Sequence, residues 1–149
     1  MAGLRSGDAS AGSPERAFLV RNLIGVDPRN GAVAVADRVR AGQNVQFQLR
    51  EAQASRQEAR QLLQNSHMHH QDSAPLAGLL FACMGRGSGL FGGPDGDVSI
   101  AREVFPTLPV AGSFCNGEIG PLGGATHLHG YTACWGLLRC DAPTGDASA

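Results

Sequence analysis

The sequence contains no lysine, since all 12 basic residues of the 149-residue chain are arginine. This absence excludes Schiff-base catalysis, a phosphate-loop lysine and every other mechanism that depends on a lysine amine. An excess of positive charge is missing as well, because 13 acidic residues bring the net charge to −1. We therefore expect neither nucleic acid nor an anionic membrane surface as a partner, and a small ligand is favoured.

Long hydrophobic segments are also absent. No apolar run approaches the roughly 18 residues that a membrane-spanning helix needs. Residues 1–16, MAGLRSGDASAGSPER, lack the apolar core of a secretory signal. From these two absences we expect a cytoplasmic protein that does not enter a membrane.

The four cysteines lack the CxxC spacing of a zinc site. A cytoplasmic setting would keep them reduced. Cys134 and Cys140 lie in the apolar run TACWGLLRC, where a thiol usually serves as a small buried hydrophobe. Cys83 and Cys115 each end a predicted strand and precede a glycine-rich stretch.

Both ends of the chain lack hydrophobic periodicity. Residues 1–16 and 141–149 consist mainly of Gly, Ser, Ala and charged residues, which predicts disordered tails. The folded domain is expected over residues 17–140, and a chain of this length forms a single hydrophobic core.

Secondary structure follows from the periodicity within the predicted domain. Apolar runs at 17–26 and 32–37 flank the turn sequence DPRNG and predict a β-hairpin, and NVQFQLR alternates as a strand does. Residues 51–66 contain neither Gly nor Pro and predict a helix, as do residues 94–105. Strands are predicted over 75–83, 109–115 and 125–139. This order predicts an α+β (mixed α/β) single domain with a mixed sheet whose helices cover one face.

Two of the predicted strands end in the same way. LAGLLFAC runs into CMGRG, and PVAGSFC runs into CNGEIGP, so that a cysteine precedes a glycine-rich bend in both places. A strand–helix–strand unit places its two strands side by side and parallel, which brings both bends to one edge of the sheet. Open sheets of this kind bind ligands at that edge.

The composition of the two bends suggests how a ligand would be held. Glycines allow close backbone approach, and successive amide N–H groups can form a concave nest for an anion. The Arg86 guanidinium suits a carboxylate or phosphate, and Glu118 would face a cationic or hydroxyl end. The predicted ligand-binding residues are Gly85, Arg86, Gly87, Cys115, Asn116, Gly117, Glu118 and Gly120.

Two simpler interpretations of the same residues stay open. Asn116-Gly117 is a common turn pair and could close a hairpin between PVAGSFC and the last strand. Arg86 and Glu118 could form an ion pair with each other and so have no ligand. Neither interpretation requires a binding site.

The histidines suggest two alternatives to a small-molecule site, a metal-binding tract and a cysteine–histidine catalytic pair. His67, His69 and His70 resemble a metal-binding tract, but they follow the first helix in a polar connector, and we expect no metal and no cofactor. His127 or His129 could approach Cys115 as a base, which would make a cysteine-dependent enzyme. No orienting residue for such a pair is recognisable, so no catalytic residue is assigned.

These motifs resemble the C-terminal domain of the FIST family, named for F-box and intracellular signal transduction proteins. The matching segments are FLVRNLIGVDPRNGAVAVAD, LLFACMGRG, FGGPDGDV, VAGSFCNGEIGPLGG and LHGYTA. The resemblance implies a sensory, non-catalytic domain that binds small molecules such as amino acids or their derivatives. It carries over the glycines, Arg86, Cys115, Asn116, Glu118 and Pro121 as matches to the family's motifs, without assigning a role to any of them.

The resemblance to the FIST family also implies a two-part protein, with an N-terminal FIST domain ahead of this one. From the resemblance we expect that domain, and the residues that lead into LVRN, to be missing from this sequence. The expected partners are thus a small amino-acid-like ligand, and either an N-terminal FIST domain or a second copy of the chain bound at an open strand edge. A protein-interaction scaffold is the remaining alternative function.

Overall fold

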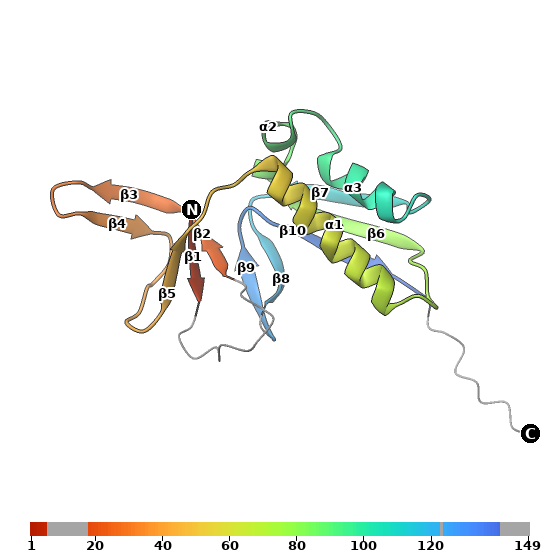
Figure 1. Cartoon of the computed structure of the whole chain (residues 1–149), viewed down its shortest axis with the longest axis horizontal. Coiled ribbons are helices and arrows are strands. Elements are labelled where there is room, and N and C mark those ends of the chain that lie inside the picture. The colour runs from red at the N-terminus through yellow and green to blue at the C-terminus, as the bar shows by residue number, and fades with distance from the viewer. Residues whose placement is uncertain (6–17, 123, 141–149) are drawn as a thin grey trace, which may run out of the picture.

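The computed structural model describes residues 1–5, 18–122 and 124–140 (Figure 1). The sequence predicted one mixed sheet for the domain, and the structure has such a sheet in β10-β6-β7, while the other described strands form three separate sheets. The central strand of the mixed sheet, β6 (Ala77–Cys83), is parallel to β7 (Val110–Cys115) and antiparallel to β10 (Ala133–Leu138). The predicted parallel pair is confirmed, and with it the α+β fold class.

Two helices cover one face of this sheet. α1 (Ala52–His69) and α3 (Gly96–Val104) pack against each other, and their side chains Leu63 and Ile100 are fully buried. Val110, Trp135 and Leu137 of the sheet pack against this core. Burial of apolar surface between helices and sheet supplies most of the folding free energy of such a layer.

The opposite face of the sheet is more open. Along β6 the residues alternate, with Leu80 and Ala82 buried under the helices while Leu79 and Phe81 are 40% and 43% exposed. The period of two in side-chain direction explains this division. The sheet therefore has a covered helical face and a half-exposed apolar face.

The first helix extends further than its sequence pattern predicted. α1 continues to His69, so that His67 and His69 lie in its last turn and not in the polar connector that the sequence predicts. Ring atoms Nδ1 of His69 and His70 pair with the carbonyl oxygens of Asn65 and Ser66, at 2.7 and 3.0 Å. These side-chain bonds satisfy carbonyls that a helix end otherwise leaves open, which favours the longer helix.

The segment after β6 is helical where the glycines predicted a loop. A single 3-10 turn η1 (Met84–Arg86) leads into the short helix α2 (Ser88–Phe91). Gly92, with φ of 76°, ends α2 in the left-handed conformation that glycine adopts without strain.

The first half of the chain forms two further sheets. β3 (Leu23–Asp27) and β4 (Ala32–Val35) form the predicted hairpin, and the side chain of Asp27 accepts hydrogen bonds within its turn. β2 (Leu19–Arg21) and β5 (Asn44–Phe47) flank β1 (Ala2–Arg5) in an antiparallel sheet.

The strand β1 corrects the prediction that residues 1–16 form a disordered tail. Residues 2–5 pair on both sides, with Ala2 and Leu4 buried. Pairing with two neighbouring strands satisfies the backbone hydrogen-bonding groups of this short strand, although its own sequence has no strand-like alternation. Residues 6–16 of that predicted tail, and the tail predicted at 141–149, lie outside the described residues.

The predicted strand over 125–139 is also interrupted. Its first part, β9 (Ala125–His129), pairs with β8 (Glu118–Leu122), whereas its second part is β10. The break falls at Tyr131, which has a positive φ of 64°, unusual for a bulky residue. The hairpin of β8 and β9 thus forms a sheet of its own, and the proposed hairpin between PVAGSFC and the last strand is wrong.

None of the described helices is long and apolar enough to span a membrane.

Candidate functional site: two hollows beside the ends of β6 and β7

The two glycine-rich bends meet as the parallel strand pair requires. Cys83 and Cys115 are register partners at the ends of β6 and β7. The chain leaves both strands at the same edge of the sheet, so the residues after Cys83 and after Cys115 emerge side by side. This arrangement was predicted from the sequence.

A hollow of about 480 Å³ lies between these bends and the first half of the chain, and we call it the polar hollow. Among the predicted ligand-binding residues, it is lined by Gly85, Asn116 and Gly117. Gly117 has a φ of 147°, a conformation that residues with a Cβ rarely adopt. Its other polar lining residues are Arg21, Asn22, Asp37, His129 and Tyr131.

An ion pair forms one wall of the polar hollow. Arg21 Nε donates to Asp37 Oδ2 at 2.6 Å, and Nη1 donates to the carbonyl oxygens of Val20 and Leu128. The hydrogen bond from Arg21, and a second from the Arg38 backbone, hold the pKa of the Asp37 carboxyl below its ordinary value. Both side chains are partly accessible, at 19% and 34%, so the wall carries a fixed positive and a fixed negative charge within reach of a ligand.

A second arginine holds the first bend in place. Arg50 Nη1 donates to the carbonyl oxygen of Gly85 at 2.7 Å, and its guanidinium lies over the Tyr131 ring at 5.0 Å. A Cβ on Gly85 would displace the end of the Arg50 side chain from this position. Arg50 thus links the bend after Cys83 to Tyr131.

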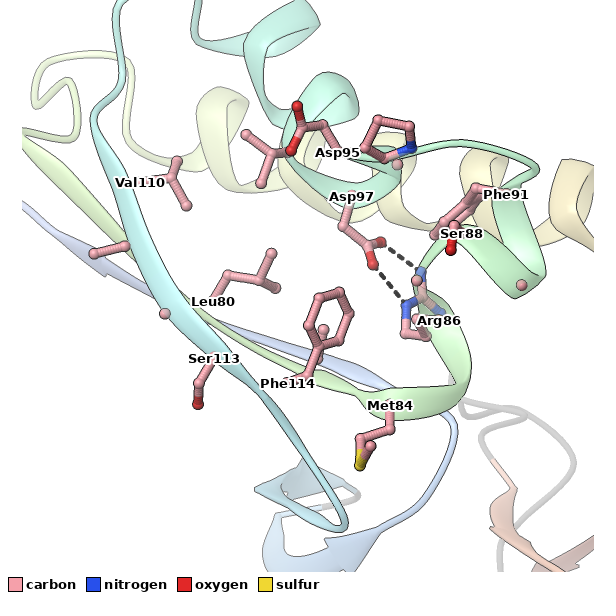
Figure 2. Close-up of a pocket in the computed structure, with 18 residues that line it drawn as sticks. Leu80, Met84, Arg86, Ser88, Phe91, Asp95, Asp97, Val110, Ser113 and Phe114 are labelled. Carbon is pink, nitrogen blue, oxygen red and sulfur yellow. Dashed lines mark hydrogen bonds and ion pairs between the residues drawn. The ribbon is translucent and has the colours of Figure 1, made fainter.

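Arg86 does not point its guanidinium at the polar hollow. Its Nε and Nη2 donate to both oxygens of Asp97, at 3.0 and 2.6 Å, and the two side chains are only 7% and 6% exposed (Figure 2). The predicted ion pair between Arg86 and Glu118 is wrong, because Asp97 of α3 is the partner. A bidentate, buried pair of this kind fixes α3 to η1 and leaves Arg86 with a structural role.

Arg86 and Gly87 instead line a second hollow of about 800 Å³, bounded by α2, α3 and β7, which we call the apolar pocket. Met84 borders both hollows, so the turn η1 separates them. The predicted site residues thus divide between two hollows, and three of them, Cys115, Glu118 and Gly120, line neither.

Glu118 is buried rather than available to a ligand. It is 1% exposed, and its Oε2 accepts hydrogen bonds from the Thr132 backbone N–H and hydroxyl, at 3.4 and 2.9 Å. Oε1 has no hydrogen-bond partner among the described residues. Because Thr132 follows Tyr131, the carboxylate ties β8 to the bend that carries Tyr131.

Cys115 and Gly120 also have structural surroundings. The Cys115 sulfur lies 3.5 Å from the Ser113 hydroxyl, and His129 Nε2 lies 2.9 Å from the Gly120 carbonyl oxygen. A Cβ on Gly120 would approach the Cys134 sulfur to 3.0 Å, so a glycine lets β8 pack closely on β10. Within the described part of the chain, no hydrogen bond joins Cys115 to His127 or His129, and the pair needed for thiolate catalysis is not assembled.

The neighbouring thiol of Cys134 should be slow to react. Burial raises its pKa above the ordinary value of 9.0; a hydrogen bond with Thr132 opposes this rise in part, and the charges of Glu118 and Cys115 add smaller increases. The protonated thiol therefore stabilises the fold at every pH below that ordinary value, and the contribution is lost as the pH rises through the higher folded-state pKa.

In iodoacetamide labelling at neutral pH, followed by peptide mass spectrometry, we expect the exposed Cys140 to be modified well before Cys134. Equal labelling rates in the folded protein would contradict this, whereas equal rates in urea are expected.

The histidine tract does not gather metal ligands. His67 stacks edge-on against Phe105 at 5.4 Å, and the other two rings bond backbone carbonyls of their own helix. Over residues 1–5, 18–122 and 124–140, no group of three or more His, Cys, Asp or Glu side chains lies close enough to hold a metal ion.

Sequence reasoning missed Arg21, Asp37 and Asp97. Arg21 and Asp37 flank the predicted hairpin of β3 and β4, and the Ala36 N–H donates to the Asn22 carbonyl at the base of that hairpin. Pairing of the hairpin strands is enough to bring these two side chains together, so their contact could have been predicted from the sequence. Asp97 gave no such signal, because its contact with Arg86 depends on where α3 packs.

Comparison with known proteins places the chain in a family. The model of the FIST C domain matches residues 2–121, which include β1 and both glycine-rich bends. The chain belongs to the FIST C domain family. This match confirms the resemblance seen in the motifs. FIST C domains are signal-transduction domains.

The relatives of this FIST C domain are mostly uncharacterised. An uncharacterised protein of Mycobacterium tuberculosis is 41% identical over 121 residues, covering 81% of this chain and 31% of its own length. One from Mycobacterium bovis is 38% identical over 124 residues, covering 83% and 32%. An F-box/LRR-repeat protein of Arabidopsis thaliana is 47% identical over 45 residues, covering 30% and 8%. The chain thus spans about a third of the length of its mycobacterial relatives, and no solved structure matches it significantly.

Proposed function

We propose that this FIST C domain is a sensory module that binds a small zwitterionic molecule, such as an amino acid or a derivative, in the polar hollow. The observation that carries the proposal is that both glycine-rich bends and the Arg21–Asp37 ion pair line one hollow. Backbone amides and one charge of each sign then stand within a space of the size that small ligands occupy.

Arg21 has the donors that a ligand carboxylate requires. Its Nε and Nη1 are held by Asp37, Val20 and Leu128, and no hydrogen bond from Nη2 reaches another described residue. Two N–H groups on a guanidinium that is already fixed in position suit a carboxylate, because little side-chain entropy is lost on binding.

Asp37 can accept the opposite end of the same ligand. One oxygen is bonded by Arg21 and the other by the Arg38 backbone N–H at 2.7 Å, and a carboxylate oxygen can accept a further bond. A ligand ammonium beside Asp37 and a ligand carboxylate beside Arg21 would extend the existing ion pair. This assignment replaces Arg86 and Glu118, whose charges are buried in other contacts.

The proposal predicts stabilisation by free L-amino acids in a thermal-shift screen. A ligand at about 100 times its dissociation constant should add roughly 2.7 kcal/mol to the free energy of unfolding. The corresponding amino-acid amide lacks the carboxylate and should bind more weakly. Loss of the charge-assisted bonds in Arg21→Gln should weaken binding by about 1.5–3 kcal/mol, or roughly 10- to 150-fold.

Arg29→Gln provides the matched control, since Arg29 lies exposed in the turn between β3 and β4. Each shift is measured against the ligand-free melting temperature of the same variant, which separates binding from the lost Arg21–Asp37 pair. The proposal fails if no L-amino acid stabilises the wild-type domain, or if Arg21→Gln and Arg29→Gln respond alike.

A further inference from the structure

The apolar pocket is built independently of the polar hollow. Its walls are mainly apolar side chains from four elements, with Leu80 from β6, Phe91 from α2, Val98 from α3, and Val110 and Phe114 from β7. Figure 2 shows the Phe114 ring pointing into the space between Leu80 and Arg86. The volume of about 800 Å³ is within the range of sites that enclose a whole small molecule.

The wall at Phe91 is formed before any ligand is present. The guanidinium groups of Arg56 and Arg86 lie 4.7 and 5.5 Å from the centre of the Phe91 ring, and Arg56 also donates to the Phe91 carbonyl oxygen. A Cβ on Gly96 would collide with the ring, so the ring packs on bare backbone. Cation–π contacts of this kind hold an aromatic ring in one orientation.

The pocket also reaches backbone hydrogen-bonding groups. All five residues from Val110 to Phe114 line it, although successive side chains of a strand point to opposite faces. The pocket therefore runs beside the edge of β7. In the described part of the chain, β7 pairs with β6 alone, so its other edge presents N–H and C=O groups that a ligand can use.

The charges around the pocket disfavour an anion. Arg86 is neutralised by Asp97, and the remaining charged lining residue is the exposed Asp95. A carboxylate that entered would lose its hydration without gaining a free cation, whereas an amide or carbonyl group would keep hydrogen bonds to the edge of β7.

We propose that the apolar pocket is a second binding site, for an uncharged small molecule with an apolar or aromatic body and an amide or carbonyl group. The body packs between Phe91, Phe114 and Leu80, and the amide bonds the open edge of β7. The site is separate from the polar hollow, so the domain has room for two chemically different ligands.

A matched pair of probes tests this proposal, since phenylacetamide and phenylacetate share a ring and differ in charge. Each is titrated into the ¹⁵N-labelled domain while the backbone amide resonances of residues 86–98 and 110–114 are followed by NMR. We expect phenylacetamide to give saturable shifts there, and phenylacetate to bind at least about tenfold more weakly.

Two phenylalanine variants locate the site. Phe114→Ala should weaken phenylacetamide binding about 2- to 10-fold, because one aromatic wall is lost. Phe81→Ala should leave it unchanged, since Phe81, also partly exposed, lies on the opposite face of the same sheet. Absence of saturable shifts in this region, binding of phenylacetate as tight as that of phenylacetamide, or equal effects of the two variants would each overturn the proposal.

Discussion

Replacing Arg86 with alanine is expected to destabilise the domain by about 3–5 kcal/mol, because Asp97 would be left buried and unpaired. A domain of this size has a total stability of about 5–15 kcal/mol, so the variant should be close to unfolding. Urea denaturation followed by circular dichroism measures the loss. The result separates the two possible roles of Arg86, since a residue that only contacts a ligand would leave the stability of the ligand-free domain almost intact.

Two further variants control this experiment. Arg102→Ala removes an exposed arginine of α3 and should change stability by no more than about 0.5 kcal/mol. The double variant Arg86→Met with Asp97→Leu removes both charges together and should recover most of the loss, because an apolar pair of similar volume is often as stable as a buried ion pair. A loss below about 1 kcal/mol in Arg86→Ala would contradict the assigned structural role.

Leu63→Ala is expected to cost about 2–5 kcal/mol, through lost apolar contact and a cavity at the centre of the core. Leu63 is completely buried where α1 meets α3, beside Ile100 and Phe105. Its sequence neighbour Leu62 is 54% exposed on the same helix, and Leu62→Ala should cost less than about 1 kcal/mol. The midpoint of urea unfolding for the two variants gives the comparison.

The leucine pair also tests the orientation of α1. Similar losses for Leu62→Ala and Leu63→Ala would mean that the helix does not bury the face described here. The sequence alone places both leucines in one apolar stripe, and only packing against α3 distinguishes them.

The regular part of the fold could be predicted from the sequence because its signals are local. Apolar runs that end in glycine-rich bends predicted β6 and β7, and the helix between them required a parallel pair. That pairing brought the two bends together, and the polar hollow follows from it. The hairpin of β3 and β4 was predictable for the same reason, since DPRNG is a strong turn signal.

The parts that could not be predicted depend on contacts between distant segments. The strand β1 has no pattern of its own and is defined by its partners β2 and β5. The sequence suggested Glu118 as a partner for Arg86, and nothing in it pointed to Asp97. The position of α3 over the sheet determines the partners: Arg86 pairs with Asp97, and Glu118 accepts a hydrogen bond from Thr132.

The proposed function requires that the bends after Cys83 and Cys115 form one binding site with Arg21. The most direct test is an NMR titration of the ¹⁵N-labelled domain with an equimolar pool of L-amino acids, read at the backbone amides of Gly85 and Gly117. Both resonances are expected to move along the same saturating curve, and Arg21→Gln should shift both curves to roughly 10- to 150-fold higher ligand concentration. A saturating shift at one bend alone, or at neither, would contradict the proposal of one shared site.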